Sequence, residues 1–175
     1  RPAFIPMALG LLSAVNLLAA DVPGNVRTLV DFDCPQAIAI RPHQAAAKTV
    51  ETESGARLEI ATEADANWPS VRIAPDAGRW NLSGCYSVQI DVWNPQDVPV
   101  RVLLSVDGPK SDGQKNCSVS STTVVSGGKT TLEAPFGVWH GEPRPLDPAK
   151  IVSVTVLLDR PQRAHKFFVD NIRAV

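Results

Sequence analysis

The chain has 175 residues, of which 44% are hydrophobic and 20% are charged, and its formal net charge is -1. This composition fits a globular domain with a sizeable core and excludes a disordered chain. The near-zero net charge, without a cluster of Lys and Arg, argues against nucleic acid or an anionic membrane surface as the partner, because attraction to both is mainly electrostatic.

The first twenty residues differ in composition from the rest. Residues 4–20, FIPMALGLLSAVNLLAA, are apolar, follow Arg1 and end before DVPGN. This pattern is typical of the hydrophobic region of a secretory signal peptide, with an uncleaved anchor or a buried N-terminal helix as the alternatives. We divide the chain into a signal-like segment (1–20), a leader (21–26) and a domain (27–175), and expect a secreted or periplasmic protein.

Short runs in which apolar and polar residues alternate follow from residue 27 onward, separated by Gly, Pro, Asn and Asp. Such runs predict half-buried strands. They are RTLVDFD (27–33), GARLEIAT (55–62), WPSVRIAP (68–75), GCYSVQIDVW (84–93), VPVRVLLSV (98–106), CSVSSTTVV (117–125), KTTLEAP (129–135), IVSVTVLLD (151–159) and KFFVDNIRAV (166–175).

The arrangement of these strands predicts an all-β fold. In run 84–93, Tyr86 and every second residue after it are expected on the core side, and residues 117–135 read as a hairpin around a Ser-Gly-Gly turn. No stretch after residue 20 has a convincing helical period. About ten short strands in this length indicate a two-sheet antiparallel β-sandwich of the jelly-roll type.

Cys34, Cys85 and Cys117 are the only cysteines. In an exported protein two of them can pair, and Cys85 with Cys117 is the preferred couple because both flank predicted strands. Free buried thiols are the alternative. The absence of a Cys-x-x-Cys motif argues against a zinc site of the usual spacing.

Two segments carry a resemblance to a known family. The segments RWNLSGCYSVQIDVWNPQDVPVRVLLSV (79–106) and FGVWHGEPRPLDPAKIVSVTVLLDRP (136–161), the latter followed by KFFVDNIR, resemble galactose-binding-like jelly rolls. More narrowly, they are similar to the non-catalytic, carbohydrate-binding-module-like domains that precede the barrel in agarases and related β-galactoside-cleaving enzymes. The resemblance covers residues 27–175 and implies a β-sandwich that binds polysaccharide or oligosaccharide of the galactan type.

The same resemblance implies a structural calcium ion. In such jelly rolls the last strand lies beside the first, and carboxylates from both hold the ion. Asp170 matches the acid of the last strand, and Asp33, or alternatively Asp31, lies on the first run. Calcium prefers six to eight oxygen ligands, which two carboxylates, backbone carbonyls and water can supply. Alternatively, Asp170 points outward or accepts hydrogen bonds from a neighbouring loop.

Candidate sugar-binding residues follow from the chemistry of a pyranose, which needs an aromatic surface edged by hydrogen-bonding groups. Trp93 lies on the polar face of its run, with Gln89 and Asp91 beside it, and Arg101 is expected on the same face of the neighbouring strand. Trp139 and His140 occupy a Gly- and Pro-rich loop, where binding residues often lie. Each of these residues has packing or solvent exposure as an alternative. Trp80 is expected in the core and Trp68 to pack at a strand start.

The sequence contains no Gly-x-Ser-x-Gly, His-Glu-x-x-His or glycine-rich phosphate motif. We therefore expect no catalysis by this domain. The favoured hypothesis is an accessory module of an exported, agarase-like enzyme that binds galactan or supports an adjacent catalytic domain. A purely structural domain that packs on a catalytic barrel, or a small glycoside hydrolase, is the alternative.

Overall fold

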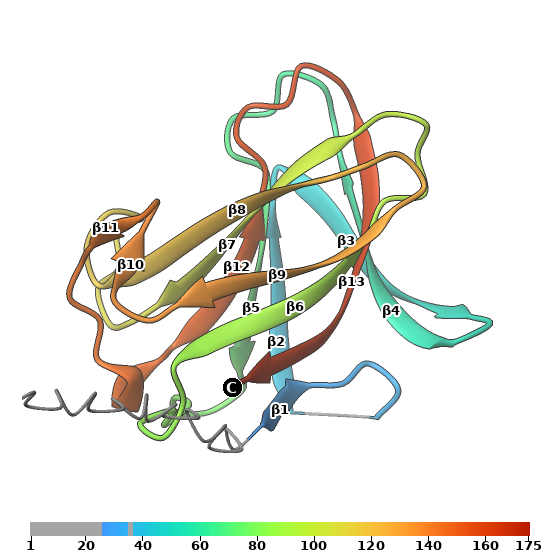
Figure 1. Ribbon diagram of the computed structural model, residues 1–175. Helices are drawn as coiled ribbons and strands as arrows, with labels where there is room; N and C mark the ends of the chain where they lie inside the picture. The colour runs from blue at the N-terminus through green and yellow to red at the C-terminus, as the bar shows by residue number, and fades with distance from the viewer. Residues whose placement is uncertain (1–25, 35–36) are drawn as a thin grey trace, which may run out of the picture.

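The computed structural model, which describes residues 26–34 and 37–175, places two largely antiparallel sheets face to face (Figure 1). Sheet A has the order β3-β4-β13-β6-β9, with β1 paired to β13, and sheet B has the order β11-β10-β8-β7-β12-β5-β2. The strands of sheet A are β1 (Arg27–Val30), β3 (Ala45–Thr52), β4 (Gly55–Thr62), β6 (Ser87–Trp93), β9 (Lys129–Pro135) and β13 (His165–Ala174). Those of sheet B are β2 (Ile38–His43), β5 (Ser70–Pro75), β7 (Val100–Asp107), β8 (Cys117–Val124), β10 (Val138–Trp139), β11 (Glu142–Pro143) and β12 (Ser153–Leu157).

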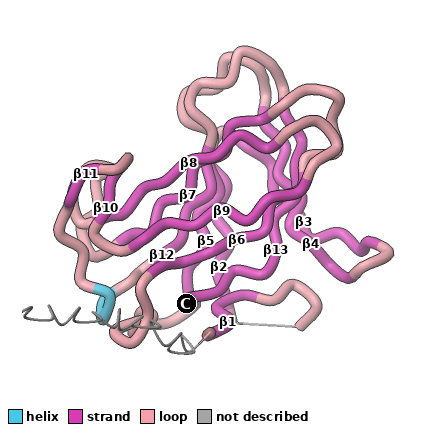
Figure 2. Tube along the Cα trace, in the orientation of Figure 1, coloured by secondary structure: helices cyan, strands magenta, loops and turns pink. Residues whose placement is uncertain are grey.

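The all-β class is thus confirmed. In the described part of the chain the one helical element is a short 3-10 turn, Pro148–Lys150, and loops connect the strands (Figure 2). No helix among these residues is long and apolar enough to cross a membrane. The signal-like segment and all but the last residue of the leader lie outside the described residues.

Period-two alternation builds the core between the sheets. Most of the long strands send every second side chain inward, and most of the inward residues are Val, Ile and Leu, whose burial contributes roughly 1.5–3 kcal/mol each. The fully or almost fully buried residues include Leu58, Ile60, Val71, Ile73, Val88, Ile90, Val92, Val102, Leu104, Val106, Val154, Val156 and Phe167. Trp80 is also in this core at 7% exposure, as expected.

The first and last strands meet, as the family resemblance implied. β1 runs antiparallel to β13, with Arg27 opposite Ala174 and Val30 opposite Ile172, and Figure 1 shows the C-terminus close to β1. The pairing of β13 with β6 is interrupted by a register shift between Asp170 and Arg173, where Asn171 has a positive φ of 50°. This bulge changes the direction of the polar side chains near the end of the strand.

Two sequence predictions, one about a hairpin and one about the direction of a side chain, are wrong. Residues 117–135 do not form a hairpin, because β8 belongs to sheet B and β9 to sheet A. Tyr86 does not face the core with Val88, since it precedes β6 and is 78% exposed. The strands β2 and β3 were not predicted, because their runs contain Pro42 and three consecutive alanines, which hide the alternation.

Candidate functional site

The outer face of sheet B, which is turned away from the core, carries a mixture of apolar and polar groups. On β7, Val102, Leu104 and Val106 face the core, so Leu103 and Ser105 point to the opposite side. Leu103 forms a second apolar cluster with residues of three neighbouring strands, namely Cys117, Val119, Leu157 and Trp139. Leu103, Cys117 and Val119 are each at most 5% exposed, so they form a small second core beneath the surface of this face.

A cavity of about 700 Å³ lies over this cluster, and two tryptophans line it. Its lining includes Trp68, Trp139, His43 and His140 at the rim, with Leu103, Val119, Leu157, Ser105 and Thr155 on the floor. Aromatic and aliphatic groups with a few convergent polar atoms are typical of a site for a small ligand. This cavity is the candidate site.

Trp139 is held in place by the short strand β10, which pairs with β8 in parallel through Val119. Its indole Nε1 donates a hydrogen bond to the carbonyl of Gly113 at 2.8 Å. The guanidinium of Arg144 lies 5.3 Å from the ring centre, and the edge of His140 contacts the ring at 4.7 Å between centroids. These contacts fix the orientation of the ring at one side of the cavity.

Trp68 comes from the turn before β5, has a positive φ of 56° and is 41% exposed. Arg160 lies 5.7 Å from the centre of its ring. Trp68 thus lies just before a strand, as expected, but its side chain is only partly packed and lines the cavity. A large exposed aromatic in such a conformation fits a ligand contact better than a packing role.

A buried carboxylate organises the polar part of the floor. Asp107, 9% exposed, accepts hydrogen bonds at Oδ1 from the hydroxyl groups of Ser105 (2.7 Å) and Ser111 (3.0 Å). At Oδ2 it accepts from Ser153 (3.2 Å) and Thr155 (2.8 Å). Since an ionised carboxylate only accepts, all four hydroxyl protons are committed to it, and the hydroxyl oxygens can serve a ligand only as acceptors.

The residues predicted to bind sugar are divided between the two sheets. Trp139 and His140 line the cavity. Trp93, Gln89 and Asp91 lie on β6, in sheet A. Arg101 does not share their sheet, because β7 belongs to sheet B, and it donates a hydrogen bond to Ser121 Oγ at 3.2 Å. The expectation that Arg101 and Trp93 lie on neighbouring strands is therefore wrong.

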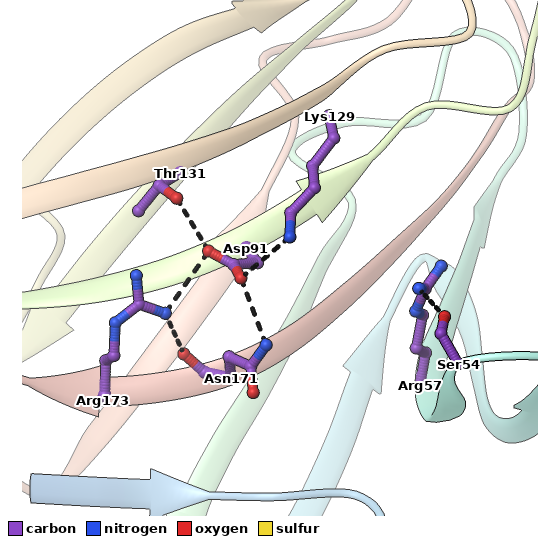
Figure 3. Close-up of polar contacts among 7 residues, drawn as sticks. All are labelled: Ser54, Arg57, Asp91, Lys129, Thr131, Asn171 and Arg173. Carbon is purple, nitrogen blue, oxygen red and sulfur yellow. Dashed lines mark hydrogen bonds and ion pairs between the residues drawn. The ribbon is translucent and has the colours of Figure 1, made fainter.

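The polar groups around Asp91 contact one another. Asp91 accepts hydrogen bonds from Thr131 (2.8 Å), Asn171 (3.1 Å) and Arg173 (3.3 Å), and Lys129 forms an ion pair with it at 3.4 Å (Figure 3). Burial by itself raises the pKa of Asp91, but these hydrogen bonds and the two cations outweigh burial and lower the pKa below its ordinary value. This cluster therefore stabilises sheet A.

Trp93, beside this cluster, is covered by cations. The guanidinium of Arg57 lies 4.0 Å from its ring centre and the ammonium of Lys129 lies 4.5 Å away. Arg57 also donates a hydrogen bond to Ser54 (Figure 3). Two cations lie closer to the Trp93 ring than the single cation, Arg144, lies to the Trp139 ring, so a sugar has less access to Trp93 than to Trp139.

Asp170 and Asp33 are the two carboxylates expected to hold a cation. Asp170 is 7% exposed, and its Oδ1 is buried without a hydrogen-bond partner among the described residues. Burial raises the pKa of Asp170 and the charges of Asp33 and Asp31 raise it further, while the backbone hydrogen bond at Asn171 and the charge of Arg57 oppose this rise. Asp33 Oδ1 accepts from the backbone N–H of Ala56 at 2.6 Å.

This donor set suits a hard cation in part. The orphaned Asp170 oxygen and the neighbouring carboxylate charge are unfavourable without a positive partner, and carboxylate oxygen is the ligand that Ca²⁺ prefers. Within the described ranges, however, no group of three or more His, Cys, Asp and Glu is arranged to hold a metal ion. The remaining ligands would have to be backbone carbonyls and water.

The three cysteines are all thiols in the structure, so of the two alternatives that the sequence left open, free thiols and a Cys85–Cys117 disulfide, the structure has the first. Cys85 packs against the main core, whereas Cys117 belongs to the apolar cluster on the outer face of sheet B. Burial raises the pKa of the Cys117 thiol above its ordinary value, and the hydrogen bond with Ser111 opposes this shift. The neutral thiol therefore serves as a small apolar residue of this cluster.

No family model matches the sequence of the chain. A stretch of 121 residues is 28% identical to Beta-agarase B from Vibrio sp. (strain JT0107), and this match covers 62% of the chain and 12% of that protein. The chain thus spans only a small part of the relative that it resembles.

The fold has several counterparts among solved structures. An exo-beta-agarase matches with a TM-score of 0.66 and 16% identity over 85% of this chain and 25% of that one. A family 11 carbohydrate-binding module from Clostridium thermocellum, solved with a β-1,3-1,4-mixed-linked tetrasaccharide, matches with a TM-score of 0.61 and 19% identity over 86% of this chain and 95% of the module. The chain therefore has the fold of carbohydrate-binding modules and of one part of agarase chains, as the resemblance in its sequence implies.

Proposed function

We propose that this domain is a non-catalytic module that binds a galactan-type polysaccharide in the cavity on the outer face of sheet B. The observation that carries the proposal is the pair of tryptophans, Trp68 and Trp139, on either side of a floor of Leu and hydroxyl side chains. The apolar C–H face of a pyranose suits the aromatic rings of Trp68 and Trp139. Its hydroxyl protons suit the acceptor oxygens of Ser105 and Thr155.

The choice of a galactan rests on the similarity to Beta-agarase B and to an exo-beta-agarase chain. The choice of a binding role rests on the fold shared with carbohydrate-binding modules, one of which was solved with an oligosaccharide. In this proposal the domain is part of an exported polysaccharide-degrading enzyme and presents substrate to an adjacent catalytic domain.

Affinity electrophoresis tests this function. The chain should migrate more slowly in gels that contain soluble agarose-type galactan than in gels without polysaccharide, and gels with mixed-linked β-glucan or mannan serve as comparisons. Retardation by glucan alone would contradict the galactan assignment and leave a sugar-binding module. Unchanged migration with every polysaccharide would favour the alternative of a structural domain that packs on its neighbour.

A calcium ion held by Asp33 and Asp170 is part of the same proposal. A bound ion would supply positive charge to the orphaned Asp170 oxygen and tie the segment after β1 to the last strand. Because a ligand that binds only the folded state stabilises that state, EDTA should lower the melting temperature of calcium-loaded protein. The Asp170→Asn variant should lose this response, and a melting temperature unaffected by EDTA would contradict the calcium site.

The pH dependence of the EDTA-treated protein adds a second readout. The pKa of Asp170 is raised in the folded state, so the carboxyl group favours folding less as the pH rises from its unfolded pKa through its folded pKa. Ionisation of Asp170 should therefore lower the free energy of unfolding of the metal-free protein as the pH rises towards neutral. Asp170→Asn, which carries no charge, should melt at a higher temperature than the metal-free parent at pH 7, with little difference near pH 3.

A further inference from the structure

Two arginines lie opposite each other at the β2–β5 edge of sheet B. The strand register pairs Arg41 on β2 with Arg72 on β5. Ile40 packs against the core and Ile73 is buried in it, so both arginines point to the outer face, where they are exposed. In the part of the chain that the structure describes, neither guanidinium forms an ion pair or a hydrogen bond. Like charges in directly opposite positions destabilise a sheet.

These arginines continue the row of side chains that crosses the candidate site. From strand to strand, the register aligns Arg41, Arg72, Thr155, Ser105, Val119 and Trp139. Arg72 is four strand spacings from Trp139, which is roughly 19 Å. A polysaccharide chain that stacks on Trp139 and runs across the strands would therefore reach the arginines.

A second cavity of about 360 Å³ adjoins the first at Thr155 and Gly113. Arg72 and Lys110 both line it, together with Asp107. The two oxygens of Asp107 each accept from two hydroxyl groups, so this carboxylate is already satisfied without a cation. The cavity thus presents two cationic side chains that have no acidic partner of their own.

We infer that Arg72, with Arg41 and Lys110, binds an anionic substituent on the polysaccharide, such as a sulfate ester or a uronate carboxylate. An oxyanion between the guanidinium groups would relieve their repulsion and accept charge-assisted hydrogen bonds, which are stronger than neutral ones. The inference rests on the proposed function, because it places the substituent on a chain bound in the cavity. Along this row, Trp139 contacts the apolar face of a sugar, Ser105 and Thr155 accept hydrogen bonds from sugar hydroxyl groups, and Arg72 binds the anion.

Calorimetric titration with three galactan oligosaccharides of equal length, one neutral, one sulfated and one bearing a uronate, tests this inference. At low ionic strength the parent should bind at least one anionic oligosaccharide about tenfold more tightly than the neutral one, and added salt should reduce the difference. The double variant R41Q/R72Q should lose this preference and keep its affinity for the neutral oligosaccharide. The matched control is R79Q, an exposed arginine that lines neither cavity, and it should behave like the parent.

The outcomes separate this inference from the function on which it rests. If the parent binds neutral and anionic oligosaccharides equally tightly, the anion site is overturned and the sugar site stays intact. A preference that survives R41Q/R72Q would also overturn it, by locating the anion elsewhere. If the parent binds neither neutral nor anionic oligosaccharides, the proposed function is contradicted as well. Comparison of the sulfated with the uronate oligosaccharide identifies the substituent.

Discussion

Replacing Trp139 with alanine is expected to weaken oligosaccharide binding by roughly tenfold to a hundredfold. The ring packs against the apolar cluster on sheet B and lines the cavity of about 700 Å³, so a sugar ring placed there would bury much of the remaining indole surface. Burial of a large apolar side chain contributes about 1.5–3 kcal/mol, which gives this range of affinity. Isothermal titration calorimetry of the variant and its parent measures the change.

Trp93→Ala is the matched control, because it removes the same kind of side chain from sheet A, where Arg57 and Lys129 cover the ring. It should bind the oligosaccharide as the parent does. Trp139→Phe keeps an aromatic ring but loses the hydrogen bond to Gly113, so it should retain most of the affinity if stacking dominates. Loss of binding in Trp93→Ala with normal binding in Trp139→Ala would place the site on sheet A instead.

Alternation in the sequence was sufficient to predict the fold class and the inward faces of the main strands. On β7 the predicted apolar face, including Val102, Leu104 and Val106, is the face that packs in the core. A period of two residues determines which side chains share a face of a strand, and it does so for any sheet to which the strand belongs. The meeting of the first and last strands came from the family resemblance, and the β1–β13 pairing confirms it.

The sheet to which each strand belongs could not be predicted from alternation. The turn after β6 looks like a hairpin turn, yet it carries the chain from sheet A to sheet B. Asn94, 1% exposed, holds this crossing by donating to the carbonyls of Val98, Val124 and Val125. These three acceptors come from two separate segments, so the role of Asn94 depends on tertiary structure. The prediction that Arg101 lies beside Trp93 was wrong for this reason.

The candidate site was predicted only in part, because tertiary structure brings some of its residues together. Trp139 and His140 were found from a Gly- and Pro-rich loop, which is a local signal. Asp107 was missed, because it stands at the end of an apolar run, and its four hydroxyl partners come from three separate segments of the chain. Only the pairing of β7 with β12 brings Ser153 and Thr155 to it. The repeated Ser and Thr at alternate positions of these runs are the one sequence signal that points to a polar floor.

Asp91→Ala is expected to lower the free energy of unfolding by about 2–3 kcal/mol, because it leaves a group of partly buried donors without their acceptor. Arg173, with a side chain 24% exposed, and Lys129, at 52%, can regain some hydration, which limits the loss. Urea unfolding followed by circular dichroism measures the difference. Glu142→Ala is the control, since Glu142 belongs to an exposed ion pair with Arg144 and its removal should change little.

The pH dependence of this loss separates the charge of Asp91 from its packing. Because the pKa of Asp91 is lowered in the folded state, its charge stabilises the protein fully above the ordinary carboxyl pKa, and this contribution disappears as the pH falls through the lowered value. The gap in stability between the parent and Asp91→Asn, which keeps the shape of the side chain, should therefore be widest near neutral pH and close in acid. A gap that stays constant down to pH 2 would mean that packing at this position, and not the carboxylate with its four partners, holds β6, β9 and β13 together.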